Sequence, residues 1–180
     1  MSTSNAFQVI MTTASSANKK TSGGYSVIKG LDTIEESACY LLQFDGLSEP
    51  NPGTSTGGAV MFCPGSRKVV FERGEFMNFA TNNQAEYTGL LIGVKSALEF
   101  DVKHLLIEGD SQLVIFQTEG KWKVKNDGLK TLNKEVRDLL SQFDFVAIRH
   151  VYRDKNEHAD RITNNVLKSG KSFFKCYRLE

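Results

Sequence analysis

The stretch TNNQAEYTGLLIGVKSAL, residues 81–98, decides the fold of this chain. Its apolar side chains recur at the spacing of one helical face, which predicts an amphipathic helix packed on a core. Glu86 lies on the edge of that face, where a carboxylate needs a partner because an unpaired buried charge is very costly. Two interpretations of Glu86 stay open at this point. Asn83 and Glu86 have the spacing of a capping box, and a carboxylate at this place is also a candidate metal ligand.

The segments before this helix predict three sequential strands. In residues 38–45, one set of side chains (Ala38, Tyr40, Leu42, Phe44) alternates with a second set (Cys39, Leu41, Gln43, Asp45), as on the two faces of a strand. Residues 59–63 form a short apolar run, and residues 68–76 are expected to form the third strand. Turn residues separate these runs, so we expect short connections and an antiparallel meander. Asp45 is expected to project at the end of the first strand.

After the helix, strands and helices alternate. The apolar run 104–110 ends in Asp110 and predicts a buried central strand, followed by a short helix over 111–117. A strand–helix–strand order implies parallel pairing, so the sheet is mixed. The remaining expected elements are a helix over 129–140, a strand over 145–152 and a helix that ends at Gly170. This last helix is expected to bury Ala159, Ile162, Thr163, Val166 and Leu167.

Composition limits the class of protein. The chain has 180 residues, enough for one well-buried domain plus a tail. Its 22 Lys+Arg and 21 Asp+Glu give a formal charge of +1, so any site for a polyanion must be a local patch. No apolar run is long enough to span a bilayer, so we expect no membrane partner. Cys39, Cys63 and Cys176 have neither zinc-site nor disulfide spacing, which indicates reduced thiols in an intracellular protein, cytoplasmic or nuclear.

Four acids take comparable places in the expected elements: Asp45, Glu86, Asp110, and Asp160 on the last helix. Each acid alone has another interpretation. Asp45 can be a turn residue, Glu86 part of a helix cap, Asp110 the end of a strand, and Asp160 an exposed residue of a helix. Together they would repel one another unless cations held them, because like charges in one pocket raise each other's pKa. Carboxylates without nearby His or Cys suit Mg²⁺ or Mn²⁺, which also prefer phosphate oxygens. Phosphodiester cleavage with two metals uses this arrangement.

The motifs around these acids carry a resemblance to a known family. In chain order they are FDG at 44–46, NPG at 51–53, TNNQAEY at 81–87, GDSQ at 109–112 and NEHAD at 156–160. As an ordered set over residues 38–168 they are similar to the motifs of type 1 ribonuclease H. The resemblance implies an α/β, ribonuclease H-like fold with a five-stranded mixed sheet in the order 3-2-1-4-5 and flanking helices. It also implies endonucleolytic hydrolysis of the RNA strand of RNA–DNA hybrids with two Mg²⁺ ions, or Mn²⁺, giving 5′-phosphate and 3′-hydroxyl products.

The resemblance assigns roles to individual residues. The family's catalytic, metal-binding acids fall on Asp45, Glu86, Asp110 and Asp160. Its nucleic-acid contacts fall on Asn51, Asn83 and Gln112 at the minor groove, and on Thr81 and Asn82 along the DNA backbone. Amides can donate and accept at base edges and sugars, and the 2′-hydroxyl distinguishes RNA from DNA. Turn and capping chemistry is the alternative interpretation of these polar residues.

The loop before the last acid departs from the family pattern. Residues 152–156 read YRDKN and lack the histidine that many members carry there. His150 is expected inside a strand and His158 on the last helix, where both read as structural histidines. Arg153 is a candidate phosphate contact in their place.

The long basic protrusion of some members is also missing. Lys121, Lys123 and Lys125 remain as candidate phosphate contacts, although a solvated charged loop is the default interpretation. The short, aromatic-poor N-terminal segment does not resemble the family's hybrid-binding domain.

Three segments follow from these observations. Residues 1–36 are rich in Ser and Thr, and we expect a mostly flexible N-terminal segment, with organelle import a weakly supported alternative. Residues 37–170 form the expected ribonuclease H-like catalytic domain, and 171–180 a basic C-terminal tail. The expected partner is an RNA–DNA hybrid, and the expected state is a monomer. A same-fold nuclease for double-stranded RNA and a catalytically silent hybrid-binding module are the alternatives. Clustered negative charge facing phosphates argues against a silent binder.

Overall fold

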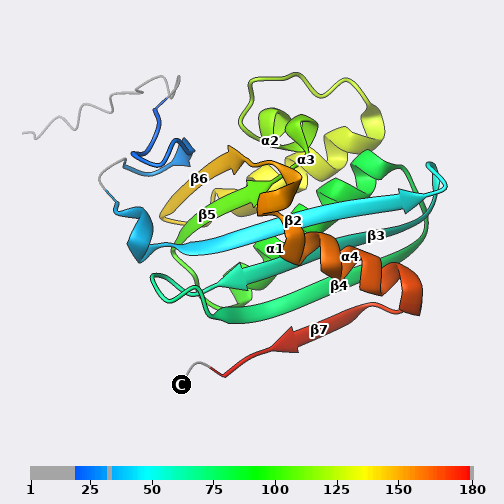
Figure 1. Ribbon diagram of the computed structural model, residues 1–180. Helices are drawn as coiled ribbons and strands as arrows, with labels where there is room; N and C mark the ends of the chain where they lie inside the picture. The colour runs from blue at the N-terminus through cyan, green and yellow to red at the C-terminus, as the bar shows by residue number, and fades with distance from the viewer. Residues whose placement is uncertain (1–18, 32–33, 179–180) are drawn as a thin grey trace, which may run out of the picture.

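The computed structural model describes residues 19–31 and 34–178 of the chain. Within these residues, seven strands form one mixed sheet in the order β1-β6-β5-β2-β3-β4-β7, and four α-helices pack on it (Figure 1). The strands are β1 (Ser26–Lys29), β2 (Tyr40–Glu49), β3 (Gly53–Phe62), β4 (Val69–Ala80), β5 (His104–Gly109), β6 (Phe145–His150) and β7 (Phe173–Cys176). The helices are α1 (Asn82–Glu99), α2 (Gln112–Thr118), α3 (Asp127–Leu140) and α4 (Glu157–Ser169), with 3-10 turns at Glu36–Ala38 and Arg153–Lys155.

The five central strands have the expected arrangement. β2, β3 and β4 form the antiparallel meander, and β5 and β6 continue the sheet in parallel to β2. If β2 to β6 are numbered 1 to 5, as in the prediction from the sequence, their order in the sheet is 3-2-1-4-5, as expected. The predicted total of five strands is wrong, because β1 pairs antiparallel with β6 and β7 antiparallel with β4 at the two edges. Each of these strands has four residues, too few for a periodic pattern to reveal it.

The N-terminal segment contains one of these edge strands. Residues 1–36 were expected to be mostly flexible, but Ser26–Lys29 are β1 and the preceding Tyr25 is buried at 1% exposure. The expectation is therefore wrong for this stretch, and for residues 1–18 it lies outside the described part of the chain. The division of the chain at residues 36 and 170 stays a prediction.

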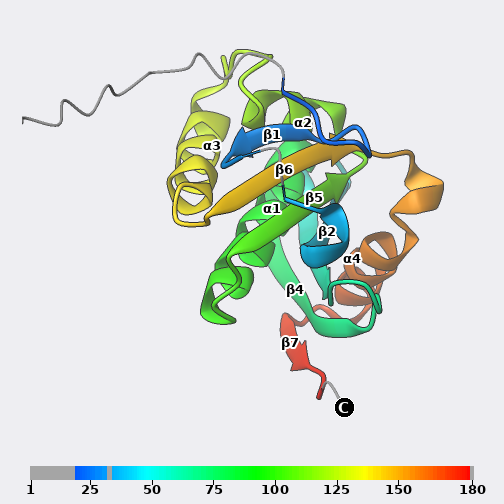
Figure 2. The same cartoon turned by 90° about the vertical axis from the view of Figure 1, so that its left-hand side faces the viewer.

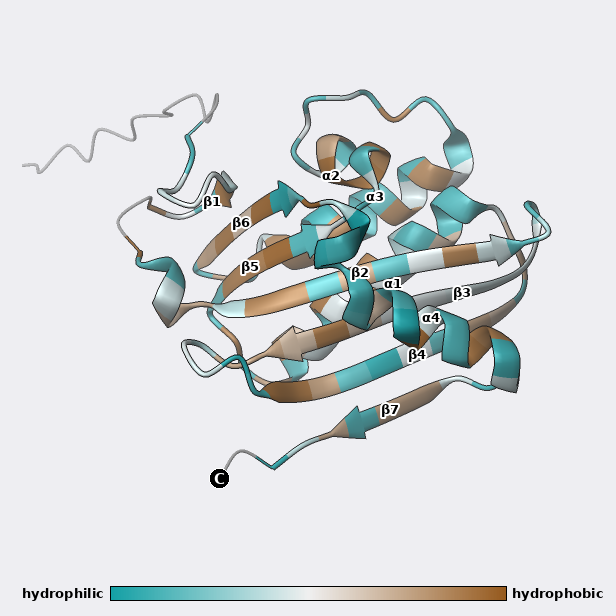
Figure 3. Ribbon diagram, in the orientation of Figure 1, coloured by the Kyte–Doolittle hydropathy of each residue, from teal (hydrophilic) through white to brown (hydrophobic). Residues whose placement is uncertain are grey.

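The two faces of the sheet are covered differently. Helices α1, α2 and α3 cover one face, where the largest core cluster includes Leu42 and Phe44 of β2 (Figure 2). On the other face, α4 packs on Val60 of β3, and Tyr25 packs with Leu41 in a separate cluster. Because side chains alternate along a strand, Gln43 and Asp45 point to this second face, between the two clusters. The strands β5 and β6 are apolar along most of their length and hydrophilic at their carboxyl ends (Figure 3).

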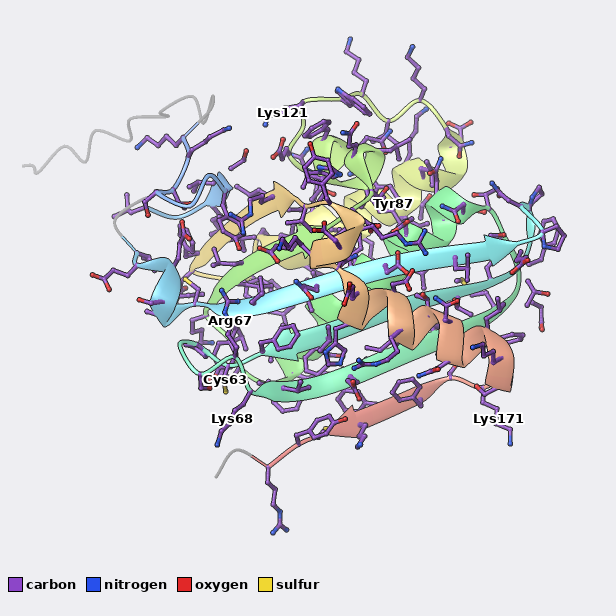
Figure 4. The ribbon with its side chains drawn as sticks, in the orientation of Figure 1. Cys63, Arg67, Lys68, Tyr87, Lys121 and Lys171 are labelled. Carbon is purple, nitrogen blue, oxygen red and sulfur yellow. The ribbon has the colours of Figure 1, made fainter. Side chains whose placement is uncertain are left out.

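Helix α1 is fixed in the interior by a buried polar link. The hydroxyl of Tyr87 donates to Gln117 of α2 at 2.9 Å and accepts from the amide of Asn133 of α3 at 3.0 Å (Figure 4). A buried hydroxyl with both partners satisfied holds three helices in one arrangement. None of the described helices is long and apolar enough to cross a membrane. Cys39, Cys63 and Cys176 are free thiols.

Candidate active site

Two of the four acids are brought together by the parallel pair of β2 and β5. The pairing ends where Phe44 lies opposite Gly109, and the next residues are Asp45 and Asp110. The two carboxylates therefore lie side by side at the carboxyl end of β5. Asp45 was expected at the end of its strand, but β2 continues to Glu49 and Asp45 lies within it.

Helix α1 delivers the third acid. Its N-cap is Thr81. The Thr81 hydroxyl accepts from the backbone N–H of Gln84, and the side-chain oxygen of Gln84 accepts from the backbone N–H of Thr81. Of the two interpretations of Glu86, the capping box with Asn83 is therefore wrong, because the helix begins two residues too early for it. Glu86 takes no part in the cap, and its carboxylate is available for other contacts.

Glycines allow the first turns of α1 to approach β2 closely. A Cβ on Gly46 would lie 2.0 Å from the backbone nitrogen of Glu86, and one on Gly89 would lie 2.3 Å from the carbonyl oxygen of Asp45. Any larger residue at either position would push the helix away from the strand. The result of this contact is a cluster in which carboxylate oxygens of Asp45, Glu86 and Asp110 all lie within 4.8 Å of one another.

Asp160 lies beside this cluster and is not part of it. Its carboxylate pairs with the Arg153 guanidinium and accepts from the Asn164 amide at 3.1 Å. It is nevertheless close enough to Asp45 to contribute to the raised pKa of that carboxyl. The structure thus brings three of the four predicted acids together and places the fourth, on α4, next to them.

Burial and mutual repulsion act against ionisation of the cluster. Burial, with the charges of Asp110 and Asp160, raises the pKa of Asp45 to about 6, although the Thr163 hydroxyl opposes the shift. Burial and the charges of Asp45 and Asp110 raise the pKa of Glu86 well above its ordinary range. Glu86 Oε2 is buried without a hydrogen-bond partner among the described residues. Three close carboxylates and an unpartnered oxygen fit a divalent cation such as Mg²⁺, for which oxygen is the preferred ligand.

Asn156 holds the cluster from the α4 side. Its fully buried side chain donates to Asp110 Oδ1 at 2.9 Å and to the carbonyl oxygen of Phe44 at 2.8 Å. It precedes α4 without capping the helix through its side chain. The sequence offered only its place in a motif, because a contact between segments so far apart in the chain depends on the tertiary fold.

A buried polar network includes Gln43 and Glu108, which lie two residues before Asp45 and Asp110 on their strands. Glu108 accepts from the Tyr25 hydroxyl at 2.5 Å, from Gln43 at 2.9 Å and from Arg149 at 2.5 Å. Burial alone would raise the pKa of Glu108, but the hydrogen bonds from these three residues outweigh it and the pKa is lowered. Gln43 also donates to the carbonyl of Lys155 at 2.9 Å, in the loop before α4. Residues two apart on a strand share a face, so the spacing of Gln43 and Glu108 from the acids was a signal that sequence reasoning missed.

His150, His158 and Arg153 each contact another part of the protein. His150 lies at the end of β6 with Nε2 3.1 Å from the carbonyl oxygen of Asp110. His158 lies on α4 with Nε2 2.5 Å from the Glu72 carboxylate. Arg153 pairs with Asp160, so its predicted phosphate contact stays a prediction.

Three of the five predicted nucleic-acid contacts line one groove of about 520 Å³. They are Asn51, Thr81 and Asn83, and Asn82 and Gln112 lie outside the groove lining. The Asn82 backbone amide donates to Asn51 Oδ1 at 2.9 Å, which ties the β2–β3 turn to the start of α1. The rest of the groove is lined by Pro52, Leu113, Gln117, Lys123, Lys125, Asn126 and Leu129.

The part of the chain that carries the four acids is similar to known proteins. Residues 43–166 match the family model described as Reverse transcriptase-like. Ribonuclease HI of Halobacterium salinarum is 40% identical over 124 residues, which are 69% of this chain and 62% of that protein. The chain therefore matches less than two thirds of the length of that relative.

Two solved structures cover the same region. The crystal structure of RNase H1 from Halobacterium salinarum is 38% identical with a TM-score of 0.70, over 72% of this chain and 98% of that one. The N-terminal RNase H domain of a Mycobacterium tuberculosis protein is 34% identical with a TM-score of 0.71, over 73% of this chain and 95% of that one. The similarity in sequence and the similarity in fold agree, and the chain belongs to the type 1 ribonuclease H family.

Proposed function

We propose that this chain is a metal-dependent endonuclease that hydrolyses the RNA strand of RNA–DNA hybrids and leaves 5′-phosphate and 3′-hydroxyl ends. The observation that carries the proposal is the cluster of Asp45, Glu86 and Asp110, with oxygens within 4.8 Å, flanked by Asp160. Buried carboxylates with raised pKa values are costly unless a cation is bound. Membership in the family supports the choice of substrate.

The four acids act as ligands in this proposal. Asp45, Glu86 and Asp110 would hold Mg²⁺, with Asp160 completing a site for two ions, and Mn²⁺ is an alternative. When bound, the cations supply Lewis-acid activation of an attacking water and stabilise the leaving 3′ oxygen. The protein's part is to keep the carboxylates fixed, through Asn156 and the close packing of α1 on β2.

The groove at the start of α1 supports a nucleic-acid substrate. The carbonyl oxygen of the Asn51 side chain accepts from Asn82, so its NH₂ group is left to donate to base edges or sugars. Thr81 and Asn83 line the same groove, and Lys123 and Lys125 add positive charge. We propose Asn51, Asn83 and Gln112 as contacts in the minor groove, and Thr81 and Asn82 as contacts to the DNA backbone.

The test is incubation of the full chain with a labelled RNA–DNA hybrid, double-stranded RNA or double-stranded DNA. Each is offered with Mg²⁺, Mn²⁺ or a chelator, and product ends are identified by sensitivity to a 5′-phosphate-dependent exonuclease. We expect internal cleavage of the RNA strand of the hybrid with either metal, and none with the chelator.

Other results have defined meanings. Preferential cleavage of double-stranded RNA would replace the proposed substrate by the same-fold alternative. Binding of the hybrid without cleavage in either metal would identify a silent binding module, and the enzyme assignment would be wrong.

A further inference from the structure

A fully buried threonine on α4 touches the acid cluster. Thr163 lies on the apolar face of the helix, beside the core residues Ile162 and Val166. A hydroxyl in such a place costs free energy unless it is hydrogen-bonded, and valine would fill the same volume without that cost. The Thr163 hydroxyl lies within hydrogen-bond distance of two acceptors, Asp45 Oδ2 at 2.7 Å and the carbonyl oxygen of Asp160 at 2.8 Å. It has a single proton, and a charged carboxylate is the stronger acceptor, so it donates to Asp45 when that carboxyl is ionised.

The backbone around Asp45 is shaped to admit this contact. Asp45 lies directly opposite Gly58 in the β2–β3 ladder. A Cβ on Gly58 would lie 2.9 Å from the Thr163 methyl carbon, so a larger residue there would displace the threonine. The Thr56 hydroxyl donates to the Thr163 carbonyl oxygen at 3.1 Å and adds one polar contact between β3 and this turn of α4. Apolar packing of α4 on Val60 of β3 holds the helix at the height that puts the Thr163 hydroxyl on the acid.

The hydrogen bond restricts Asp45 in a specific way. Asp45 is a residue only 7% exposed, and one oxygen of its carboxylate is bound from the α4 side, which restricts rotation of the carboxylate. An oxygen of the Asp45 carboxylate also lies within 4.8 Å of the carboxylate oxygens of Glu86 and Asp110, where a cation would bind. Partners of this kind orient metal ligands, and their loss typically costs about 10–100-fold in metal affinity or activity.

We propose that Thr163 is a positioning residue that sets the orientation of Asp45 for metal binding. The inference rests on the proposed metal-dependent function of the same site. It does not require Thr163 to touch the substrate or the cation.

The test compares Thr163→Val and Thr163→Ala, which remove the hydroxyl, with Thr163→Ser, which keeps it. Thr56→Val is the matched control, because it removes a buried hydroxyl from the same helix contact without touching an acid. Mn²⁺ affinity is measured by calorimetry on the nucleic-acid-free protein, and the kcat and KM for hybrid cleavage are measured across a Mg²⁺ titration. Thermal unfolding checks that each variant is folded.

We expect Thr163→Val and Thr163→Ala to weaken Mn²⁺ binding by about 10–100-fold and to raise the Mg²⁺ needed for half-maximal kcat, with little change in KM. Thr163→Ser should recover most of the affinity, and Thr56→Val should bind Mn²⁺ like the wild type. A folded Thr163→Val or Thr163→Ala with wild-type Mn²⁺ affinity overturns the inference, as does failure of serine to restore it. A wild type that binds Mn²⁺ but cuts no hybrid would refute the proposed function, while the affinity series would still decide the role of Thr163.

Discussion

Asp45 is held in surroundings that oppose its charge. Its carboxyl is buried next to Glu86 and Asp110, and burial is the largest cause of its raised pKa. The Thr163 hydroxyl stabilises the charged form but does not outweigh the other effects. A site built in this way destabilises the folded protein when no cation is present, and a bound cation stabilises the folded state by mass action.

The first prediction concerns the stability of the metal-free protein as a function of pH. The pKa of Asp45 is raised from 3.8 to about 6, so the folded state binds more protons than the unfolded state in this window, and stability falls as pH rises through it. Asp45→Asn removes this cost. At pH 8 with chelator the variant should be more stable than wild type by up to about 3 kcal/mol, at roughly 1.4 kcal/mol per pKa unit.

Urea unfolding with chelator between pH 4 and 8 measures this difference. The advantage of Asp45→Asn should shrink toward pH 4, where the wild-type carboxyl is protonated in the folded state. Added Mg²⁺ should stabilise the wild type more than the variant. A difference in stability that does not change with pH would show that Asp45 titrates normally.

Among the elements, β1 has a larger structural role than its four residues suggest. The residue before it, Tyr25, fills the second face of the sheet with Leu41 and Leu106, and its hydroxyl donates to Glu108. The Arg149 guanidinium lies over the Tyr25 ring, 4.1 Å from its centroid. The segment of Tyr25 and β1 thus covers a part of this face of the sheet that α4 does not cover.

The second prediction is that Tyr25→Ala destabilises the protein by about 3–5 kcal/mol, the range for loss of a buried aromatic side chain. The variant leaves both a cavity and a Glu108 carboxylate with one partner fewer. Tyr25→Phe is the control, because it keeps the ring and should cost only about 1–2 kcal/mol. Denaturant unfolding measures both values, and a Tyr25→Ala protein as stable as the wild type would show that this segment contributes little to the fold.

Much of the element pattern could be predicted from the sequence. The helix expected over 81–98 is Asn82–Glu99, because its apolar periodicity is long and regular. Its cap was misplaced because Thr81 with Gln84 and Asn83 with Glu86 have the same spacing, and only the helix start distinguishes them. The edge strands could not be predicted, since their pairing depends on tertiary contacts.

The same limit applies to the site. Asp45 and Asp110 lie close together because β2 and β5 pair in parallel. The strand–helix–strand order of the sequence predicts this parallel pairing. Thr163 could not be distinguished from a core residue, because a hydroxyl on an apolar helix face reveals its partner only in three dimensions. Asn156 was hidden for the same reason.

For the whole molecule, a net charge of +1 means that attraction to nucleic acid must come from a local surface. The groove at the α2–α3 loop is a local surface that can attract nucleic acid, because two positively charged residues, Lys123 and Lys125, line it together with polar side chains. Figure 4 places Lys121 of the same loop on the opposite side of the molecule from Lys171.

The third prediction is that the double substitution Lys123→Ala and Lys125→Ala weakens hybrid binding and reduces its salt dependence. Each lysine that contacts a phosphate should lower the slope of log affinity against log salt by about one. Lys171→Ala, which also removes a positive charge, is the control and should leave affinity nearly unchanged. Fluorescence anisotropy of a labelled hybrid with Ca²⁺ in place of Mg²⁺, across a salt series, measures the slopes, and equal slopes for wild type and double variant would exclude the groove as a phosphate contact.

The most direct test of the central claim, that the clustered acids hold the catalytic metal, is hybrid cleavage and hybrid affinity measured together for Asp110→Asn. The substituted amide keeps an oxygen that can accept from Asn156, so the local structure should persist. We predict that single-turnover cleavage in Mg²⁺ falls by roughly a thousandfold or more, as loss of several kcal/mol of metal stabilisation implies. Affinity for the hybrid should be retained or improve, because one negative charge facing the phosphates is gone. Near-normal cleavage by this variant would contradict the account, since Asp110 could then not be an essential metal ligand.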